Sequence, residues 1–293
     1  MTPALLRSLG LVSSALGAIL AAHAVAYFGI SLLPDSATRL AGILGGSDAI
    51  LTGLREQFQQ RGYLNRLGSL LVGDMGNSVD GVPIVRVIGD ALALSAPRLL
   101  LAALLLVAVG AAVLRRPPSD DKLTPWLEWA VQIPPFVWCF IGFIVVVLIS
   151  DGVDKSILSV SSFATVLATM AAPAALLALQ TRSVMRDLAG SDFAVYMKSL
   201  GIGEAEAAGV VRSAAIRQLM PSIEKLVMWL TLSLIFAEML LSMPGLGLAL
   251  TAALSRSDVD ALLGLIIVLA VISNGTRLVV GLWEIIETRG GER

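Results

Sequence analysis

The stretch Asp192-Phe-Ala-Val-Tyr-Met-Lys-Ser-Leu-Gly-Ile-Gly-Glu-Ala-Glu-Ala-Ala-Gly209 mixes polar and apolar residues within a chain that is otherwise largely hydrophobic. Phe193, Met197 and Leu200 recur at i, i+4 and i+7, which places them on one face of a helix. Gly201 follows as a residue that can end a helix with a positive φ at no steric cost. The pattern therefore predicts a short helix with an apolar face.

The flanking residues support this helix and predict a second one. Asp192 lies in the first turn and Lys198 in the last turn, where each charge suits the helix dipole. A second helix is predicted over residues 204–219, because Pro221 cannot continue it without losing a hydrogen bond. The two helices would form a short, exposed helix–turn–helix between membrane spans. It is either an ordinary loop on the membrane surface or an apolar docking face for a partner.

Composition places most of the chain in lipid. Its 293 residues are 56% hydrophobic and 15% charged, whereas a soluble domain carries about 25% charged residues. The net charge of −1 gives no indication of a nucleic-acid partner. Cys139 is the single cysteine, so no intrachain disulfide can form and a small core residue is expected. His23 is the single histidine and cannot build a metal site alone; we expect it to face a neighbouring helix or water.

Six apolar runs predict an all-α membrane protein with six transmembrane helices. They cover residues 5–33, 91–114, 126–149, 161–179, 223–241 and 261–284. Pro134 and Pro135 predict a kink in the third helix. The first run is long enough to remain as an anchor, so a cleaved secretory signal is not expected.

Segment 34–91 separates the first two predicted spans and is polar and glycine-rich. It is predicted to lie in water. Within it, residues 57–78 have the apolar spacing of an amphipathic helix that ends in a glycine-containing turn.

Basic residues concentrate on one side of the six predicted spans, and the positive-inside rule assigns that side to the cytoplasm. This side holds both termini, residues 115–125 and the loop 181–222. Its basic residues are Arg7, Arg115, Arg116, Lys122, Arg182, Arg186, Lys198, Arg212, Arg217, Lys225, Arg289 and Arg293, whereas the opposite short loops offer only Lys155 and Arg256.

The residues do not assemble a recognisable catalytic set, so the chain is predicted not to be an enzyme. An aspartyl pair would need two acids facing each other within lipid, but Asp151, Asp154, Asp258 and Asp260 fall at the outer ends of predicted spans. No glycine-rich phosphate loop of the G-x-x-x-x-G-K-S/T type occurs. Any ATP must therefore be hydrolysed by another subunit.

Glu238 and Arg277 fall within predicted spans, where a charge is costly and usually faces protein or water. Glu238 lies in the fifth span and either lines a translocation path or pairs with a polar group of the helix bundle. Arg277 is close enough to the inner end of the sixth span to reach the interface with its long side chain.

The chain resembles the permease subunits of ABC importers. The spacing from Asp192 to Gly201, with a basic residue three positions before the glycine, resembles their EAA loop. The narrower resemblance is to the B-type subunit of the dipeptide/oligopeptide/nickel branch. Matching segments are Gly73-Asp-Met-Gly-Asn-Ser78, the P-x-F motif Pro134-Pro-Phe136, Gln180-Thr-Arg-Ser-Val-Met185, and Glu238 with Pro244-Gly-Leu-Gly247. Tyr196 and Met197 depart from the pattern, which has small residues there.

The resemblance implies a type I ABC importer permease fold, with residues 1–293 as a single transmembrane domain in a bacterial inner membrane. Its loop 181–222 would carry a coupling helix that docks into a groove on a cytoplasmic ATPase. The residues implied for this coupling are Asp192, Phe193, Tyr196, Met197, Lys198, Leu200, Gly201, Gly203 and Glu204. Glu238 would lie on the substrate pathway.

The resemblance also implies partners and a cargo. The partners would be a homologous second permease subunit, two ABC ATPase subunits and an extracytoplasmic substrate-binding protein, all in contact with or near membrane lipid. This chain would need no cofactor, since ATP and Mg would bind to the ATPase subunits. The cargo would be peptides or a similar small solute. The alternatives are a chelated metal such as nickel, an opine-like solute, or a stand-alone channel or secondary transporter, which would predict an inverted repeat.

Overall fold

The computed structural model describes residues 3–31, 62–116, 124–150, 157–256 and 258–290. The regular elements in these ranges are helices, with one isolated bridge between Asn77 and Pro83. The chain divides into two compact units. The first contains Met1–Leu94 and Pro244–Arg293, and the second is Ser95–Met243.

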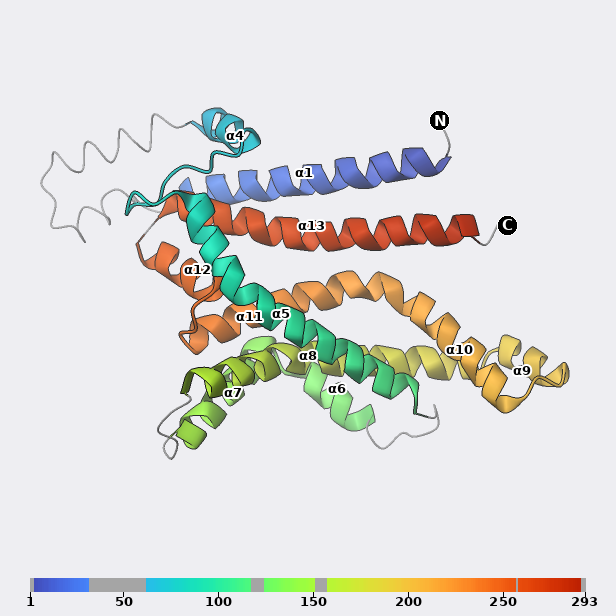
Figure 1. Cartoon of the computed structure of the whole chain (residues 1–293). Helices are drawn as coiled ribbons and strands as arrows, with labels where there is room; N and C mark the ends of the chain where they lie inside the picture. Colours follow the sequence, from blue (N-terminus) through green and yellow to red (C-terminus); the bar gives the residue numbers. More distant parts are fainter. Residues whose placement is uncertain (1–2, 32–61, 117–123, 151–156, 257, 291–293) are drawn as a thin grey trace, which may run out of the picture. The chain divides into compact units, whose positions relative to one another are not determined.

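In the first unit, α1 (Pro3–Ser31) and α13 (Val259–Gly290) lie side by side and antiparallel, so the two chain ends lie at the same end of this pair (Figure 1). Gly281 allows close approach, because a Cβ there would stand 2.7 Å from Cδ1 of Leu11. The short helix α12 (Leu246–Ser255) packs on α13. The unit also contains α4 (Tyr63–Leu71) and the first turns of α5 (Ile84–Leu114).

The second unit is arranged around α8 (Ile157–Ala189). The helices that pack on it include α6 (Thr124–Gln132), α7 (Pro135–Ser150), α10 (Glu204–Leu219) and α11 (Ile223–Leu240). Small residues bring the helices together, as expected in lipid, where packing rather than water drives association. One buried cluster consists of Cys139, Ala168 and Ala237. Cys139 is thus a buried core residue, as predicted.

Four helices of the described ranges are long and apolar enough to cross a membrane. The count rises to five if α6 and α7, bent by 97° at their junction, form one span. The kink predicted at Pro134 and Pro135 is therefore confirmed. Proline lacks an N–H and disfavours helical geometry at the preceding residue. The predicted fifth span forms α11, but this 18-residue helix carries Glu224, Lys225 and Glu238. Six spans remain a prediction.

Two helices are longer than the predicted spans and continue into the predicted segments between spans. The segment 34–91 was predicted to be water-exposed, and α5 begins within it at Ile84; its location outside the membrane stays a prediction. Ile84 is fully buried, and a Cβ at Gly264 would stand 2.7 Å from its Cγ2. The loop 181–222 likewise begins inside α8, which continues to Ala189. Thr181 and Met185 are buried at helical spacing and prolong its packed face.

Other parts of the prediction differ in smaller ways. The helix α12 was not predicted, since its 10 residues are too few for a span. Within residues 62–78, the described part of the predicted amphipathic segment, the helix is α4, Tyr63–Leu71. Residues 32–61, which include the start of that segment and the end of the first predicted span, lie outside the described residues.

Candidate functional site

The predicted helix–turn–helix is present in the second unit. Its first helix, α9, is Asp192–Ser199, and its second, α10, has the predicted bounds. Gly201 ends α9 with a φ of 76°. The N–H of Ile202 donates to the carbonyl oxygen of Met197 at 3.2 Å, and Ile202 packs against the cluster that contains Met197. This hydrogen bond and apolar contact together are those of a Schellman helix end.

Met197 was expected on an exposed face, and that expectation is wrong. Its side chain is 3% exposed and lies in a cluster with Met185 of α8 and with Val211 and Ala215 of α10. Helical spacing places a residue on a face but does not say what covers that face. Here α8 and α10 fold against α9, so Met197 fastens the hairpin to the bundle. We call this cluster the hairpin anchor.

The neighbouring apolar side chains of α9 stay exposed. Phe193, Tyr196 and Leu200 are 46%, 60% and 59% exposed. At i, i+3 and i+7 they share one helix face. Asp192 at the start of α9 is also exposed, and the side chain of Lys198 lies outside the described residues.

The turn leads into an acidic helix start. Gly203 is the N-cap residue of α10 and provides no side-chain cap. Glu204 and Glu206 stand in the first turn, where carboxylates interact favourably with the helix dipole. The hairpin thus ends in a protruding surface that combines apolar and acidic residues.

Glu238 is fully buried in the second unit and has polar partners there. Arg98 of α5 donates from Nη1 to Oε1 at 2.9 Å. The hydroxyl of Ser95, one turn earlier, lies 2.7 Å from Oε1 and 3.0 Å from Oε2. Of the two interpretations of Glu238, this geometry favours pairing within the helix bundle. Its place on a substrate path stays a prediction.

The sequence reasoning missed Arg98 as the partner of Glu238. The signal was available, since Arg98 is itself a charged residue in an apolar helix. A buried charge is costly unless it is paired. Two opposite charges in separate spans are therefore candidate partners.

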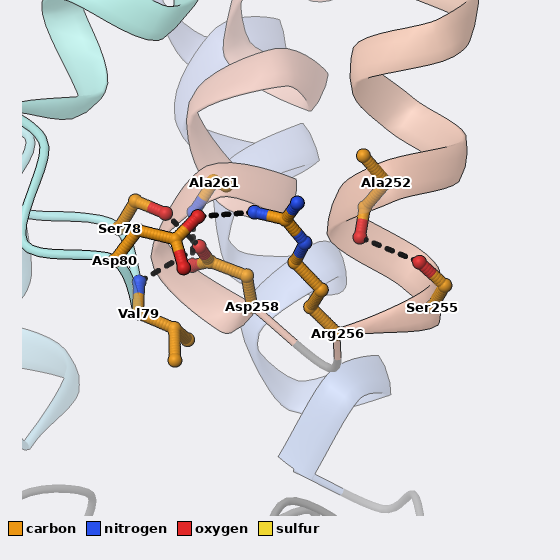
Figure 2. A network of polar contacts seen from close by, with 8 residues as sticks. All are labelled: Ser78, Val79, Asp80, Ala252, Ser255, Arg256, Asp258 and Ala261. Atoms are coloured by element: carbon orange, nitrogen blue, oxygen red, sulfur yellow. Dashed lines mark hydrogen bonds and ion pairs between the residues drawn. The ribbon is translucent and has the colours of Figure 1, made fainter. Parts of the chain in front are cut away.

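In the first unit, Asp258 joins the Gly73–Ser78 motif to the start of α13 (Figure 2). Its Oδ1 accepts the N–H of Ala261 at 3.0 Å, so Asp258 caps this helix. Its Oδ2 accepts the hydroxyl of Ser78 at 2.5 Å and the N–H of Val79 at 3.0 Å. Asp258 is only 3% exposed. The carboxylate that was predicted at an outer helix end therefore has a structural role.

The glycines of the same motif shape the turn. Gly73 and Gly76 have φ values of 83° and 81°, which other residues adopt only with strain. The N–H of Gly76 donates to Oδ1 of Asp74 at 2.9 Å. Beside this turn, Arg256 forms an exposed ion pair with Asp80, also drawn in Figure 2. The Gly73–Ser78 motif and the Arg256–Asp80 ion pair together hold this loop against the junction between α12 and α13.

His23 is buried, and its ring lies 5.6 Å from that of Tyr63 on α4. It lines a small cavity of about 150 Å³ together with Arg66, whose guanidinium lies 3.0 Å from the Asp260 carboxylate. His23 therefore faces a neighbouring helix, one of the two predicted outcomes. Among the residues that the structure describes, no three His, Cys, Asp or Glu side chains are grouped so that they could hold a metal ion.

Residues 104–283 match the model of the family described as binding-protein-dependent transport system inner membrane component. This match runs from the middle of α5 through the hairpin and into α13, and it covers more than half of the chain. The chain belongs to this family. A search of curated proteins gave no match.

Membership of this family confirms the predicted class of protein, a transport permease. The protein is a multi-pass inner membrane permease component of a binding-protein-dependent ABC transport system. It is a non-catalytic transport component, and such a permease works with a substrate-binding protein and an ATPase. Because of this membership, the stand-alone channel or secondary transporter is set aside. The family match does not separate the peptide/nickel branch from others.

Proposed function

We propose that this permease forms half of the translocation pathway of an ATP-driven importer for peptides or a similar small solute. Its α9–α10 hairpin would be the element that docks on the ATPase. The observation that carries this proposal is the difference in exposure between the apolar side chains of the hairpin's first helix. Phe193, Tyr196 and Leu200 are exposed, whereas Met197 is fixed in the hairpin anchor.

The hairpin anchor gives a physical route from docking to transport. It joins α9 to α10 and to the end of α8, and Leu114 of α5 packs against it. In turn, α8 contacts α6, α7 and α11 within the second unit. A displacement of α9 would therefore act on the ends of long helices rather than on a loose loop. ATP-driven closure of the ATPases could then tilt the spans and alternate access to a central cavity.

The nine implied coupling residues take different parts in this proposal. Phe193, Tyr196 and Leu200 would enter the ATPase groove as apolar anchors, as amphipathic helices commonly do. Met197 would position them without touching the partner. Gly201 and Gly203 would shape the turn. Asp192, Lys198 and Glu204 would form a charged rim.

The topology proposal retains six spans, both termini in the cytoplasm and the hairpin on the same side. It rests on the asymmetry of basic residues. A homologous second permease, which is either another chain or a second copy, would complete the pathway. The cargo rests on the resemblance to the peptide branch alone, and a chelated metal such as nickel or an opine-like solute is the alternative.

Two matched substitutions on α9 test the docking role. Tyr196→Asp introduces a charge on the proposed docking face, whereas Val195→Asp introduces it on the opposite face at a side chain that is 64% exposed. We expect Tyr196→Asp to lose the ATPase on co-purification and Val195→Asp to keep it. Both variants should insert into the membrane, because both positions are exposed. Equal ATPase recovery with the two variants would contradict the docking role.

A further inference from the structure

We propose that a hollow between α1 and α13 binds a phospholipid headgroup that carries both a phosphate and an ammonium group, such as phosphoethanolamine. The hollow has a volume of about 480 Å³ and lies at the end of the helix pair that holds both chain ends. Its charged lining consists of Arg7 from α1 and of Arg277 and Glu284 from α13. Such a volume is in the ordinary range for small-ligand sites.

Small residues create the hollow. Gly281 lets Leu11 approach α13 so closely that a Cβ would stand 2.7 Å from the leucine Cδ1. Beside this contact, Gly10 and Ser14 of α1 line the hollow without filling it. The two helices therefore approach closely at Gly281 and leave space next to this contact.

The charges in the hollow are not neutralised by ion pairs with the described part of the chain. Arg277 is 18 residues from the start of α13 at Val259, which is about 27 Å of helix at ~1.5 Å per residue. The hydrocarbon layer is about 30 Å thick. Arg277 thus lies near the far boundary of that layer, where a guanidinium needs an anionic partner or water.

The set of three charges matches one headgroup better than others. Two guanidiniums can bind a phosphate through charge-assisted hydrogen bonds, and the Glu284 carboxylate can accept from an ammonium. A purely anionic headgroup would meet repulsion from Glu284. Basic pockets between helices at a membrane surface are known to bind lipid headgroups.

The surroundings of the hollow suit a lipid rather than a free phosphate. Leu9 of α1 and Ile286 of α13 are 51% and 68% exposed and can contact acyl chains. Trp283, 51% exposed, lies beside Glu284 in α13, and tryptophan favours the headgroup level of a membrane.

Native mass spectrometry of the purified complex, supplied with phosphatidylethanolamine and phosphatidylglycerol in equal amounts, tests this site. We expect wild type to retain phosphatidylethanolamine preferentially. The double variant Arg7→Gln/Arg277→Gln should reduce the retention of both lipids about tenfold. Glu284→Gln should remove the preference for phosphatidylethanolamine while retaining phosphatidylglycerol. Arg116→Gln, which changes an exposed arginine outside the hollow, is the control and should behave as wild type.

Ser14→Phe provides a second test that alters no charge, because the ring would project from α1 into the hollow and obstruct part of it. We expect it to release the lipid as the double arginine variant does. Unchanged retention in both variants would overturn the proposal, as would an unchanged lipid preference in Glu284→Gln. A disulfide between a cysteine at Ser14 and a partner permease would also overturn it, because it would show that protein occupies the hollow.

Discussion

Replacing Glu238 by glutamine removes one charge of a pair that lies inside the helix bundle. Glu238 is fully buried and Arg98 is 12% exposed, with 2.9 Å between Nη1 and Oε1. At that distance and an effective dielectric constant of about 20, the attraction is about 6 kcal/mol before desolvation. Removing one member of a buried pair typically costs about 3–5 kcal/mol, because the other charge is left uncompensated. We therefore expect Glu238→Gln and Arg98→Gln each to destabilise the assembled complex strongly.

The double variant Glu238→Gln/Arg98→Gln separates this explanation from others. It leaves no buried charge, so it should melt at a higher temperature than either single variant. The assay is the melting temperature of the detergent-solubilised complex, followed by the loss of the monodisperse peak in size-exclusion chromatography. Glu224→Gln, on the same helix and only partly buried, is the control and should melt as wild type.

Two results would refute this reasoning. One is a double variant whose loss of stability equals the sum of the two single losses. The other is Glu238→Gln that melts as wild type but no longer transports, which would support a role of Glu238 on the substrate path instead.

Three further predictions concern the hairpin, the outer turn and the topology. Met197→Ala should cost about 2–5 kcal/mol through the cavity it leaves, so limited proteolysis should cut the hairpin faster than in wild type; an unchanged cleavage rate would argue against the hairpin anchor. Asp258→Ala should cost about 0.5–2 kcal/mol from the lost helix cap alone and lower the melting temperature of the complex more than Asp80→Ala, whose ion pair is exposed. A membrane-impermeant thiol reagent added outside should label a cysteine at Asn77 but not one at Ser213, both exposed positions, in a Cys139→Ser background; the reverse labelling would invert the proposed topology.

The positions of most helices could be predicted from the local sequence. The second helix of the hairpin has the predicted bounds, and the first ends before Gly201 as predicted, because stop signals act over a few residues. The kink at Pro134 and Pro135 followed from the same local chemistry. Membership of the transport family was also foreseen, from motifs whose order along the chain agreed.

Long-range packing did not follow from local sequence. The helical spacing of Met197 predicts an exposed face, but side chains of α8 and α10 bury it. α8 precedes α9 in the chain, and α10 turns back onto α9. The partner of Glu238 is 140 residues away in the chain, and the partner of Ser78 is 180 residues away. The periodicity of apolar residues along one helix does not indicate which residues of distant segments will pair. The charges of Glu238 and Arg98 within apolar spans were themselves visible in the sequence, and asking what neutralises each would have found the pair.

Cross-linking between α9 and the ATPase tests the coupling role of the hairpin most directly. A photoactivatable thiol reagent attached to Phe193→Cys or to Val195→Cys, in a Cys139→Ser background, reports which face of α9 contacts the ATPase. Phe193 lies on the proposed docking face and Val195 on the opposite one, and both are exposed. We predict an ATPase adduct from position 193, with a yield that changes when ATP is added, and little or none from position 195. Equal adducts from both positions, or adducts from neither, would contradict docking through this face of α9.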